Sequence, residues 1–433
     1  MKSKRKHLMI LGGGFATLPM IKIFEKAFAG DESLKISIIS RENFFLFTPM
    51  LPEVASGSIE TRHIVHPIRQ LCRKIHFYQS VVESIDLRER TVTASHPSGP
   101  HRHTWHFDYL VIAVGSVTNF FNLPGLHEHA LTLKSLGDAI HIRNYVIDKM
   151  EQAEIEQDPQ LRAELLTFVV SGGGFAGVEL AGELNDFLRE ASRHYASIRP
   201  SDIHIYLIEA LPRILPEVSE ELGRFATENL KKRGILIITG VQVNGATGHA
   251  VQLKDGREIR TRTLIWTAGV STNPLVAQLE CRKDELGRIK VNEYLEVTGC
   301  SNAWAVGDCA SVINASTGNP FPPTAQHAVR EGKVTAKNIV AAIRAVPMEP
   351  FEYKMRGQLA MLGRRAGVGI ILGVPVQGFL AWWLWRSYYL LRLPTFQKKL
   401  RVITDWTIEL FFPRDITQIK VSRGVIVSEK ESV

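Results

Sequence analysis

The sequence predicts an α/β protein that contains two strand–loop–helix units of one kind and a different region at its carboxyl end. A short apolar run leads into the loop Gly-Gly-Gly-Phe-Ala at residues 12–16, and another leads into the same five residues at positions 172–176. A helical pattern follows each loop. Near the carboxyl end, residues 366–385 carry no charge. With 433 residues, 45% hydrophobic and 22% charged, the chain is long enough for two or three globular domains and is neither disordered nor fibrous.

The first unit has the pattern of a dinucleotide-binding opening. Gly12 permits the tight turn, and Gly14 lets the backbone approach a pyrophosphate, whose charge the amino end of the following helix stabilises. Thr17 stands where a third glycine or alanine is usual. The second strand ends at Ser40, where an acidic residue is expected to hold ribose hydroxyls, and Glu42 is close enough to replace it.

The second unit is more regular. After the apolar residues 168–170, Gly172, Gly174 and Gly177 stand at the three glycine positions, and the next strand ends at Glu209. A carboxylate at this strand end accepts hydrogen bonds from both hydroxyls of an adenosine ribose. It also repels a 2′-phosphate, which predicts NADH rather than NADPH as the ligand.

Three further segments fit two sheets of this kind. The apolar runs 109–115 and 264–269 each end in a glycine turn, as expected of the strands that complete the two sheets. The run 303–306 ends in Gly307 and Asp308, and an Asp at a strand end can bind the ribityl chain of a flavin. A single glycine loop is a weak indicator. Two copies, each between a strand and a helix, predict two Rossmann-like dinucleotide-binding domains.

This arrangement resembles the flavoprotein superfamily with two dinucleotide-binding domains over nearly the whole chain. In that family the first domain binds FAD, and the second, which is inserted into the first, binds NAD(P)H. The resemblance implies an FAD-binding domain at residues 1–128 and 276–345, an NADH-binding domain at residues 129–275, and a C-terminal membrane-anchoring region at residues 346–433.

Three segments narrow the resemblance to the type II NADH:quinone oxidoreductases, or alternative NADH dehydrogenases. Residues 322–332 resemble the motif Ala-Gln-x-Ala-x-Gln-x-Gly of that family, with Arg330 where the family often has Gln. Residues 47–57 resemble its segment near the isoalloxazine ring. Residues 177–182 match its second glycine helix and would direct Glu179 toward the junction of nicotinamide and flavin. The alternative for Glu179 is a capping or helix-dipole role in the first turn.

The resemblance also implies the residues of the site. Catalytic roles fall to Glu179, which would order the nicotinamide or assist proton delivery, and to Gln326, which would donate to a quinone carbonyl. FAD, bound without a covalent link, would contact Gly12, Gly14, Phe15, Ala16, Ser40, Arg41, Pro49, Ala113, Gly115, Gly307, Asp308, Ala325 and Gln326. NADH would contact Gly172, Gly174, Phe175, Gly177, Glu179, Glu209, Ala268 and Gly269.

The carboxyl end is basic and aromatic. Residues 351–433 contain 13 Lys or Arg against six Asp or Glu, whereas the first 350 residues have an excess of only one positive charge. Glycine and proline interrupt the uncharged stretch, so we expect a strand over residues 367–372 and a helix from Gly378. The residues that follow are of the types that a bilayer interface favours: Trp382, Trp383, Trp385, Arg386, Tyr388, Tyr389, Arg392, Lys398, Lys399, Arg401, Trp406, Phe411 and Phe412.

We therefore predict amphipathic helices that bind an anionic membrane surface, as in the family that the chain resembles. A helix pair buried against the FAD domain and a membrane-spanning helix are the alternatives. The short apolar run after the amino-terminal residues is a first strand rather than a signal sequence, so we expect the protein on the cytoplasmic face of the cell inner membrane, bound peripherally.

The predicted function is FAD-dependent transfer of two electrons from NADH to a membrane quinone, without proton pumping. Two alternatives stay open: a soluble reductase of the ferredoxin or rubredoxin type, and a non-catalytic NADH-sensing flavoprotein. We expect no nucleic-acid partner, and the sequence leaves open whether the chain forms a homodimer.

Cysteine and histidine do not indicate a metal or disulfide centre. The four cysteines are scattered and form no CxxC pair, which argues against a zinc ribbon, a disulfide reductase and a sulfide:quinone reductase. A histidine-rich segment lies in a predicted hairpin without a neighbouring carboxylate or cysteine, so we interpret it as a solvated loop rather than a metal site. Its histidines are His96, His101, His103 and His106.

Overall fold

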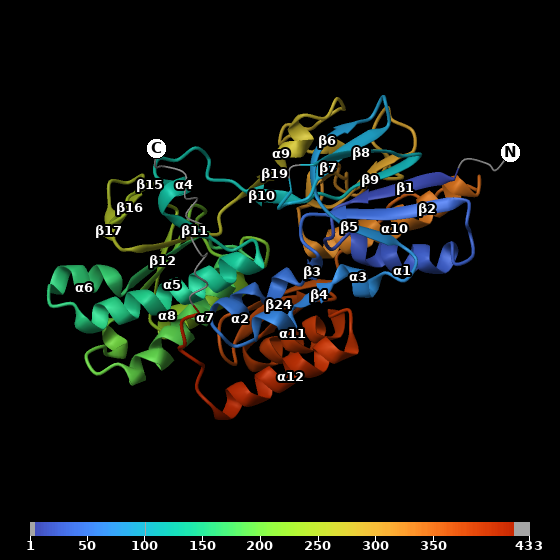
Figure 1. The fold of residues 1–433 in the computed structure, drawn as a ribbon. Helices are drawn as coiled ribbons and strands as arrows, with labels where there is room; N and C mark the ends of the chain where they lie inside the picture. Colours follow the sequence, from blue (N-terminus) through green and yellow to red (C-terminus); the bar gives the residue numbers. More distant parts are fainter. Residues whose placement is uncertain (1–4, 100, 420–433) are drawn as a thin grey trace, which may run out of the picture.

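The computed structural model describes residues 5–99 and 101–419 and contains two five-stranded parallel sheets (Figure 1). The strand order is β21-β9-β1-β2-β5 in the first sheet and β11-β18-β12-β13-β14 in the second. The first consists of β1 (Lys6–Leu11), β2 (Leu34–Ser40), β5 (His76–Gln79), β9 (Tyr109–Ile112) and β21 (Ala303–Ala305). The second consists of β11 (Ala130–Thr132), β12 (Thr167–Ser171), β13 (His204–Glu209), β14 (Ile235–Thr239) and β18 (Thr263–Trp266). Each glycine loop therefore leaves the central strand of its sheet.

The apolar runs of the sequence form the central strands. Every residue of β9 and β12 is buried, as expected of parallel strands covered on both faces. In the first sheet, Leu8 pairs with both Ile36 and Tyr109, and in the second, Phe168 pairs with Ile205. The sequence prediction of these strands is confirmed.

The second sheet is inserted between β9 and β21 of the first. The chain crosses to it through β10 (Ser116–Thr118) and returns through β19 (Val270–Thr272), and these two strands pair antiparallel. The α/β fold with an inserted second unit, which the resemblance implied, is what the structure has.

Helices pack beside each sheet. Gly332 allows α1 and α10 to approach closely, because a Cβ at this position would lie 2.0 Å from the backbone oxygen of Ala16. The helices of the first unit are α1 (Thr17–Ala27), α2 (Leu51–Ala55), α3 (Ile68–Leu71), α9 (Pro274–Ala277) and α10 (Ala325–Ile343). Those of the second are α4 (Leu126–His129), α5 (Leu136–Ile155), α6 (Pro159–Leu165), α7 (Phe175–Ala191) and α8 (Glu220–Lys232).

Smaller antiparallel sheets and pairs complete the two units. The histidine-rich segment lies in the hairpin of β7 and β8, as predicted, and the described residues hold no group of three or more His, Cys, Asp or Glu that could bind a metal ion. Two of them are three-stranded sheets: β6 (Val81–Asp86), β7 (Thr91–Ser95) and β8 (Arg102–His106), and β15 (Val243–Ala246), β16 (Ala250–Leu253) and β17 (Glu258–Arg260). The others are the antiparallel pair β3 (Phe44–Leu46) and β4 (Val65–Pro67) and the parallel pair β20 (Ile289–Lys290) and β22 (Ala310–Ser311).

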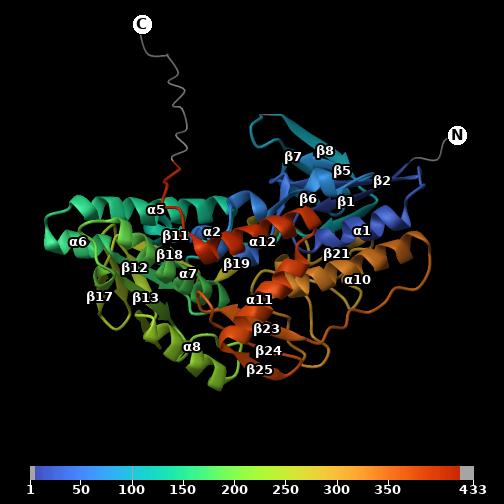
Figure 2. The same ribbon diagram turned by 90° about the horizontal axis from the view of Figure 1, so that it is seen from below.

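The carboxyl-terminal unit is a three-stranded antiparallel sheet followed by two helices. The sheet has β23 (Gly357–Met361), β24 (Gly367–Ile371) and β25 (Val374–Gln377), and the helices are α11 (Gly378–Arg392) and α12 (Phe396–Phe411). The strand from residue 367 and the helix from Gly378 were predicted. Seen from below, α11 and α12 lie next to each other (Figure 2). Within the described parts of the chain, no helix is long and apolar enough to cross a membrane.

The two faces of the helices α11 and α12 differ. This corrects the prediction that all of their aromatic and basic residues belong to a bilayer interface. Trp382, Trp385 and Trp406 are buried, and the Arg386 guanidinium carbon lies 4.3 Å from the ring centre of Trp382 and 4.6 Å from that of Trp406. These four residues are core residues rather than interface residues, because helical periodicity places them on the face that packs inward. Part of the basic excess, including Lys420, lies outside the described residues.

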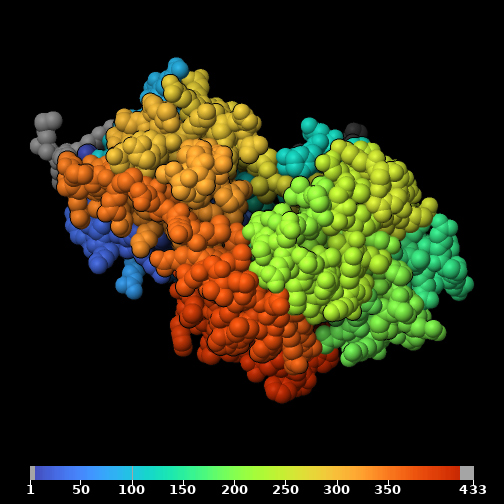
Figure 3. Space-filling model, turned by 180° about the vertical axis from the view of Figure 1, so that it is seen from behind, coloured from blue at the N-terminus to red at the C-terminus, as the bar shows by residue number. Residues whose placement is uncertain are grey.

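Exposed apolar side chains gather on the opposite face of α11 and α12. We call this set the outer apolar face; it consists of Phe379, Leu380, Trp383, Leu391, Phe396, Leu400, Ile403, Ile408, Leu410, Phe411 and Phe412. Isolated exposed apolar residues are ordinary, whereas a set of this size on two adjacent helices indicates an interaction surface. The space-filling view shows that the carboxyl-terminal unit, in red, adjoins both the orange part of the first unit and the green second unit (Figure 3).

Candidate functional site

The first glycine loop forms an open cradle at the end of β1. Gly12 has a φ of +107°, and a Cβ there would lie 2.1 Å from the backbone oxygen of Ala113, so only glycine fits this turn. A Cβ at Gly14 would meet nothing within 4 Å. Thr17, in place of the third glycine, donates a hydrogen bond from its hydroxyl to the Gly12 carbonyl at 2.7 Å. The Thr17 and Leu18 amides donate to the Gly14 carbonyl, whereas the amides of Phe15 and Ala16, just before α1, have no acceptor among the described residues and are available to a phosphate.

Two carboxylates lie near the end of β21, Asp308 in the turn after the strand and Glu331 on α10. Asp308 Oδ2 accepts a hydrogen bond from Ser116 Oγ at 2.6 Å and lies 3.6 Å from Lys134 Nζ. Glu331, one of the buried residues of α10, accepts a hydrogen bond from the Gly307 amide at 2.7 Å, and burial raises its pKa to about 7. Glu331 was missed by the sequence reasoning, because nothing in its spacing connects α10 with the turn at Gly307.

Three further residues proposed for FAD, Ser40, Arg41 and Pro49, lie in the first unit. Ser40 ends β2, and its Oγ would lie 3.0 Å from a Cβ at Gly13, so it stands beside the loop. Arg41 is exposed, and its Nε lies 3.4 Å from Glu42 Oε1. The Glu42 carboxylate, which was expected to replace an acidic residue at the strand end, is therefore paired with Arg41. Pro49 lies in the short 3-10 helix Thr48–Met50. An open glycine loop, an uncapped helix and Asp308 suit the pyrophosphate and ribityl groups of FAD, so these residues fit the cofactor.

The second glycine loop has the same backbone form and tighter packing. Gly172 has a φ of +113°. A Cβ at Gly177 would lie 1.8 Å from the Gly172 carbonyl oxygen, which excludes any other residue. Glu209 Oε2 accepts a hydrogen bond from the Gly173 amide at 2.5 Å, and Oε1 accepts one from the Leu211 amide at 2.8 Å. These bonds hold the carboxylate against the loop, where a ribose would lie.

The other residues proposed for NADH lie at the ends of α7 and β18. Phe175 is the first residue of α7, whose amino end carries no side-chain cap. Ala268 and Gly269 follow β18, and the Phe121 ring covers Gly269, since a Cβ there would lie 2.5 Å from Phe121 Cζ. Phe121 also has a φ of +52°, which a bulky residue rarely adopts. The sequence reasoning missed Phe121.

Gln326 lies in the first turn of α10 beside Ala325, after the capping residue Thr324. Its amide nitrogen donates to the Tyr353 hydroxyl. Arg330 donates to the Gln326 carbonyl at 2.9 Å, and its guanidinium carbon lies 4.4 Å from the centre of the Tyr353 ring. Arg330 and Tyr353 therefore fix this turn, and the side-chain oxygen of Gln326 keeps its capacity to accept. Tyr353 could not be linked to Gln326 from the sequence.

Glu179 is buried where α7 meets the carboxyl-terminal unit. Its Oε1 accepts hydrogen bonds from the Met361 amide at 3.0 Å and from the Trp385 indole at 2.8 Å. Burial raises the pKa of Glu179 to about 8, so the group is protonated near neutral pH. The capping alternative is wrong, because the first turn of α7 contains no acidic residue. Tyr389 is a partly buried neighbour whose pKa is raised by burial and then by Glu179.

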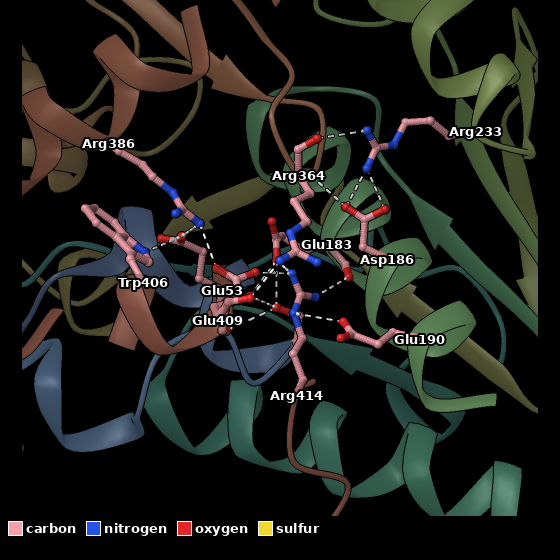
Figure 4. Close-up of polar contacts among 12 residues, drawn as sticks. Glu53, Glu183, Asp186, Glu190, Arg233, Arg364, Arg386, Trp406, Glu409 and Arg414 are labelled. Atoms are coloured by element: carbon pink, nitrogen blue, oxygen red, sulfur yellow. Dashed lines mark hydrogen bonds and ion pairs between the residues drawn. The ribbon is translucent and has the colours of Figure 1, made fainter. Parts of the chain in front are cut away.

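A buried cluster of charges joins the same region to the rest of the protein (Figure 4). Arg414 lies 3.2 Å from Glu183 of α7 and 2.8 Å from Glu409 of α12, and Arg386 lies 2.9 Å from Glu409 and 3.6 Å from Glu53 of α2. Burial raises the pKa of Glu53 more than Arg386 lowers it, so Glu53 holds a proton. For Glu409 the balance is opposite, because Arg414 and Arg386 outweigh burial and lower its pKa. The cluster ties α2, α7 and the carboxyl-terminal unit together.

Two family models match this chain. The pyridine nucleotide-disulphide oxidoreductase model matches residues 6–332, and the NDH2 C-terminal domain model matches residues 355–415. A probable NADH dehydrogenase of Dictyostelium discoideum is 34% identical over 96% of this chain and 91% of the relative. The type II NADH:quinone oxidoreductase Ndh of Mycobacterium tuberculosis is 32% identical over 95% of this chain and 89% of the relative.

A solved structure with the same fold agrees. NDH2 of Plasmodium falciparum, solved in complex with NADH, superposes with a TM-score of 0.87 at 21% identity, over 95% of this chain and all of that chain. Together with the two glycine loops and the helical carboxyl-terminal unit, these similarities place the chain in the pyridine nucleotide-disulphide oxidoreductase family and, within it, among the type II NADH:quinone oxidoreductases.

Proposed function

We propose that this chain carries out its family's reaction through the residues described above, passing two electrons from NADH by way of FAD to a membrane quinone without pumping protons. The observation that carries the proposal is the pair of glycine loops on two sheets joined by β10 and β19, with Gln326 and Glu179 near the carboxyl-terminal unit. When bound, FAD accepts a hydride and releases electrons to a second acceptor.

The second glycine loop holds NADH. The free amides of α7 bind its pyrophosphate, and Glu209 accepts hydrogen bonds from the adenosine ribose hydroxyls. The Glu209 carboxylate is already fixed by the Gly173 amide, so a 2′-phosphate would meet an immobile negative charge. NADH is therefore preferred over NADPH.

The quinone end of the site lies toward Gln326 and the carboxyl-terminal unit. Gln326 is held by Tyr353, and it accepts or donates at the quinone headgroup. Glu179 is protonated near neutral pH, and it accepts a hydrogen bond from Trp385 of the carboxyl-terminal unit. It therefore holds a proton next to this unit while the buried side chain stays uncharged. Glu179 delivers a proton or orders the nicotinamide. It does so through Oε2, because Met361 and Trp385 both donate to Oε1.

The outer apolar face binds the membrane peripherally, on the cytoplasmic side. Trp383 and Phe411 are 53% and 76% exposed, and Arg392, Lys398, Lys399 and Arg401 lie on the same two helices. Aromatic rings at the headgroup level and cations near an anionic surface are the usual components of interfacial helices. The opposite face of these helices is packed against the rest of the protein, so the outer apolar face is the one that is left for a membrane.

Two measurements test the proposal. Anaerobic NADH should bleach the flavin absorption of the purified protein, and a quinone should restore it; bleaching without reoxidation by quinone would favour a soluble reductase that uses another acceptor. Replacing both Trp383 and Phe411 by Ser should weaken binding to anionic vesicles by on the order of tenfold or more. The matched control replaces Ile155 and Leu286, which are 80% and 70% exposed elsewhere, and should leave binding unchanged. Equal loss in both variants would contradict the membrane assignment.

A further inference from the structure

A basic groove lies between α10 and residues 351–356. The cavity has a volume of about 370 Å³, toward the lower end of the range of about 300–1,000 Å³ for small-molecule sites. Five of its lining residues are cations and only one is an acid. The lining consists of Arg330, Lys333, Val334, Lys337, Phe351, Glu352, Tyr353, Lys354 and Arg356.

The cations of this groove differ in how they are held. Arg330 is fixed over the Tyr353 ring, and Lys337 lies 2.8 Å from Glu349. Lys333, Lys354 and Arg356 are exposed, and within residues 5–99 and 101–419 none of the three forms an ion pair. The groove therefore carries a positive charge that this part of the chain does not neutralise.

The backbone adds further donors. Residues 352–356 run between α10 and β23 without helix or strand, and no acceptor in the described chain receives a hydrogen bond from their amides. Several cations form a donor set suited to an oxyanion with many acceptor positions, and the free amides belong to the segment that lines the groove. A single carboxylate has two oxygens and uses such a set less fully than a phosphate does.

We propose that this groove binds the phosphate group of an anionic ligand, with the headgroup of an anionic phospholipid as the source that its position favours. The residues of the groove lead directly into β23 of the carboxyl-terminal unit, and the orange and red surfaces are continuous on one side of the molecule (Figure 3). A bilayer that meets the outer apolar face would bring lipid phosphates to this side. The lipid source rests on the proposed membrane binding; the phosphate chemistry of the groove does not.

The test compares two triple variants of the full-length, FAD-containing protein. The groove variant replaces Lys333, Lys354 and Arg356 by Gln, and it leaves Arg330 and Gln326 untouched. The control variant replaces Arg224, Lys231 and Lys232, three exposed cations of α8, by Gln and so changes the net charge equally. NADH oxidation with a water-soluble acceptor should be the same in all three proteins, which shows that they are folded.

Two ligands separate the sources of phosphate. Binding to phosphatidylglycerol vesicles, relative to phosphatidylcholine vesicles, should fall about tenfold or more in the groove variant and less than about twofold in the control. Glycerol phosphate, followed by broadening of its ³¹P NMR signal, reports on the groove without a bilayer, and the groove variant should abolish the broadening.

The outcomes are distinguishable. Loss of vesicle binding in the groove variant alone supports the lipid source, and groove-dependent broadening without vesicle binding supports a soluble phosphate ligand and refutes the membrane proposal. If the unmodified protein binds anionic vesicles as strongly as the groove variant does, and glycerol phosphate is not bound, the groove proposal is wrong while membrane binding stands. If the unmodified protein binds neither, both proposals fail.

Discussion

The two glycine loops share the residues Gly-Gly-Gly-Phe-Ala and then diverge, position by position. Where the first unit has Thr17, bonded to the Gly12 carbonyl, the second has Gly177, pressed against the equivalent carbonyl. Ser40 ends one second strand and Glu209 ends the other. We propose that the same backbone motif serves two different nucleotides and that the residues at its edges decide which one is bound.

The helices after the two loops differ even more. On α7, Glu179 and Glu183 point into the carboxyl-terminal unit, whereas the equivalent positions on α1 are Pro19 and Ile23. α1 packs instead against α10 at Gly332. Buried carboxylates on only one of two equivalent helices indicate that α7 connects the second unit with the carboxyl-terminal unit, and the following predictions test this asymmetry.

Replacing Arg414 by Met should have the largest effect on stability. It leaves Glu183 buried without its counter-charge and Glu409 with Arg386 alone, and loss of one partner of a buried pair typically costs about 3–5 kcal/mol. Urea unfolding measures the loss. The control, Lys22→Met on the exposed side of α1, should change the free energy of unfolding by less than about 0.5 kcal/mol. Equal midpoints for Arg414→Met and the unmodified protein would show that the charge cluster does not hold the two parts together.

Replacing Gly177 by Ala should break the second loop. The added Cβ overlaps the Gly172 carbonyl oxygen, so we expect a loss of about 1–3 kcal/mol and a rise in the KM for NADH of about tenfold or more, with FAD retained. Thr17→Ala at the equivalent position removes only one hydrogen bond, worth about 1 kcal/mol, and should leave the KM for NADH unchanged. Steady-state kinetics and flavin content check both variants; the same NADH kinetics in both would remove the distinction between the loops.

Replacing Glu209 by Gln should narrow the preference for NADH over NADPH. The unmodified carboxylate repels a 2′-phosphate at close range, and its removal should lower the ratio of the two kcat/KM values by about tenfold. Ser40→Ala, at the matching strand end of the first unit, should leave this ratio as it is. Equal efficiency with both nucleotides before any substitution would refute the assignment of Glu209.

Replacing Glu179 by Gln should flatten the pH dependence of stability. Burial raises the pKa of Glu179 from 4.5 to about 8, so between these values the folded protein holds a proton that the unfolded chain has released. The free energy of unfolding therefore falls as pH rises through this window, by up to about 1.4 kcal/mol per pH unit from this group. Gln can accept the same bonds from Met361 and Trp385 without titrating, so its slope should be flatter.

The unmodified protein and the Glu179→Gln variant are compared by the slope of the free energy of unfolding against pH. The difference between these slopes gives the contribution of Glu179 apart from that of the other buried carboxyls. Glu53 and Glu331 have pKa values raised by burial and contribute in the same direction in both proteins, as does the nearby Glu183. Parallel slopes between about pH 5.5 and pH 7.5 would mean that Glu179 is ionised in the folded protein. Such a result would also remove it as a proton donor.

The sequence by itself determined the elements whose signal is local. Apolar runs buried on both faces, glycines that permit a positive φ and the turn at Gly378 predicted the central strands, both loops, the histidine-rich hairpin and the start of α11, because each depends on neighbouring residues only. The FAD and NADH assignments followed from residues within one unit, such as Asp308 and Glu209, and from a family resemblance. They remain predictions at the level of single residues.

Only the tertiary structure decided what lies between the units. Trp385 and Trp383 are two residues apart in one aromatic helix, yet one bonds to Glu179 in the core and the other faces outward. Composition indicates that such a helix is amphipathic, but which face is covered depends on α7 and α2, far away in the sequence. The partners of Glu53, Glu183 and Arg414 come from three separate segments, and a buried charge is tolerated only where those segments meet.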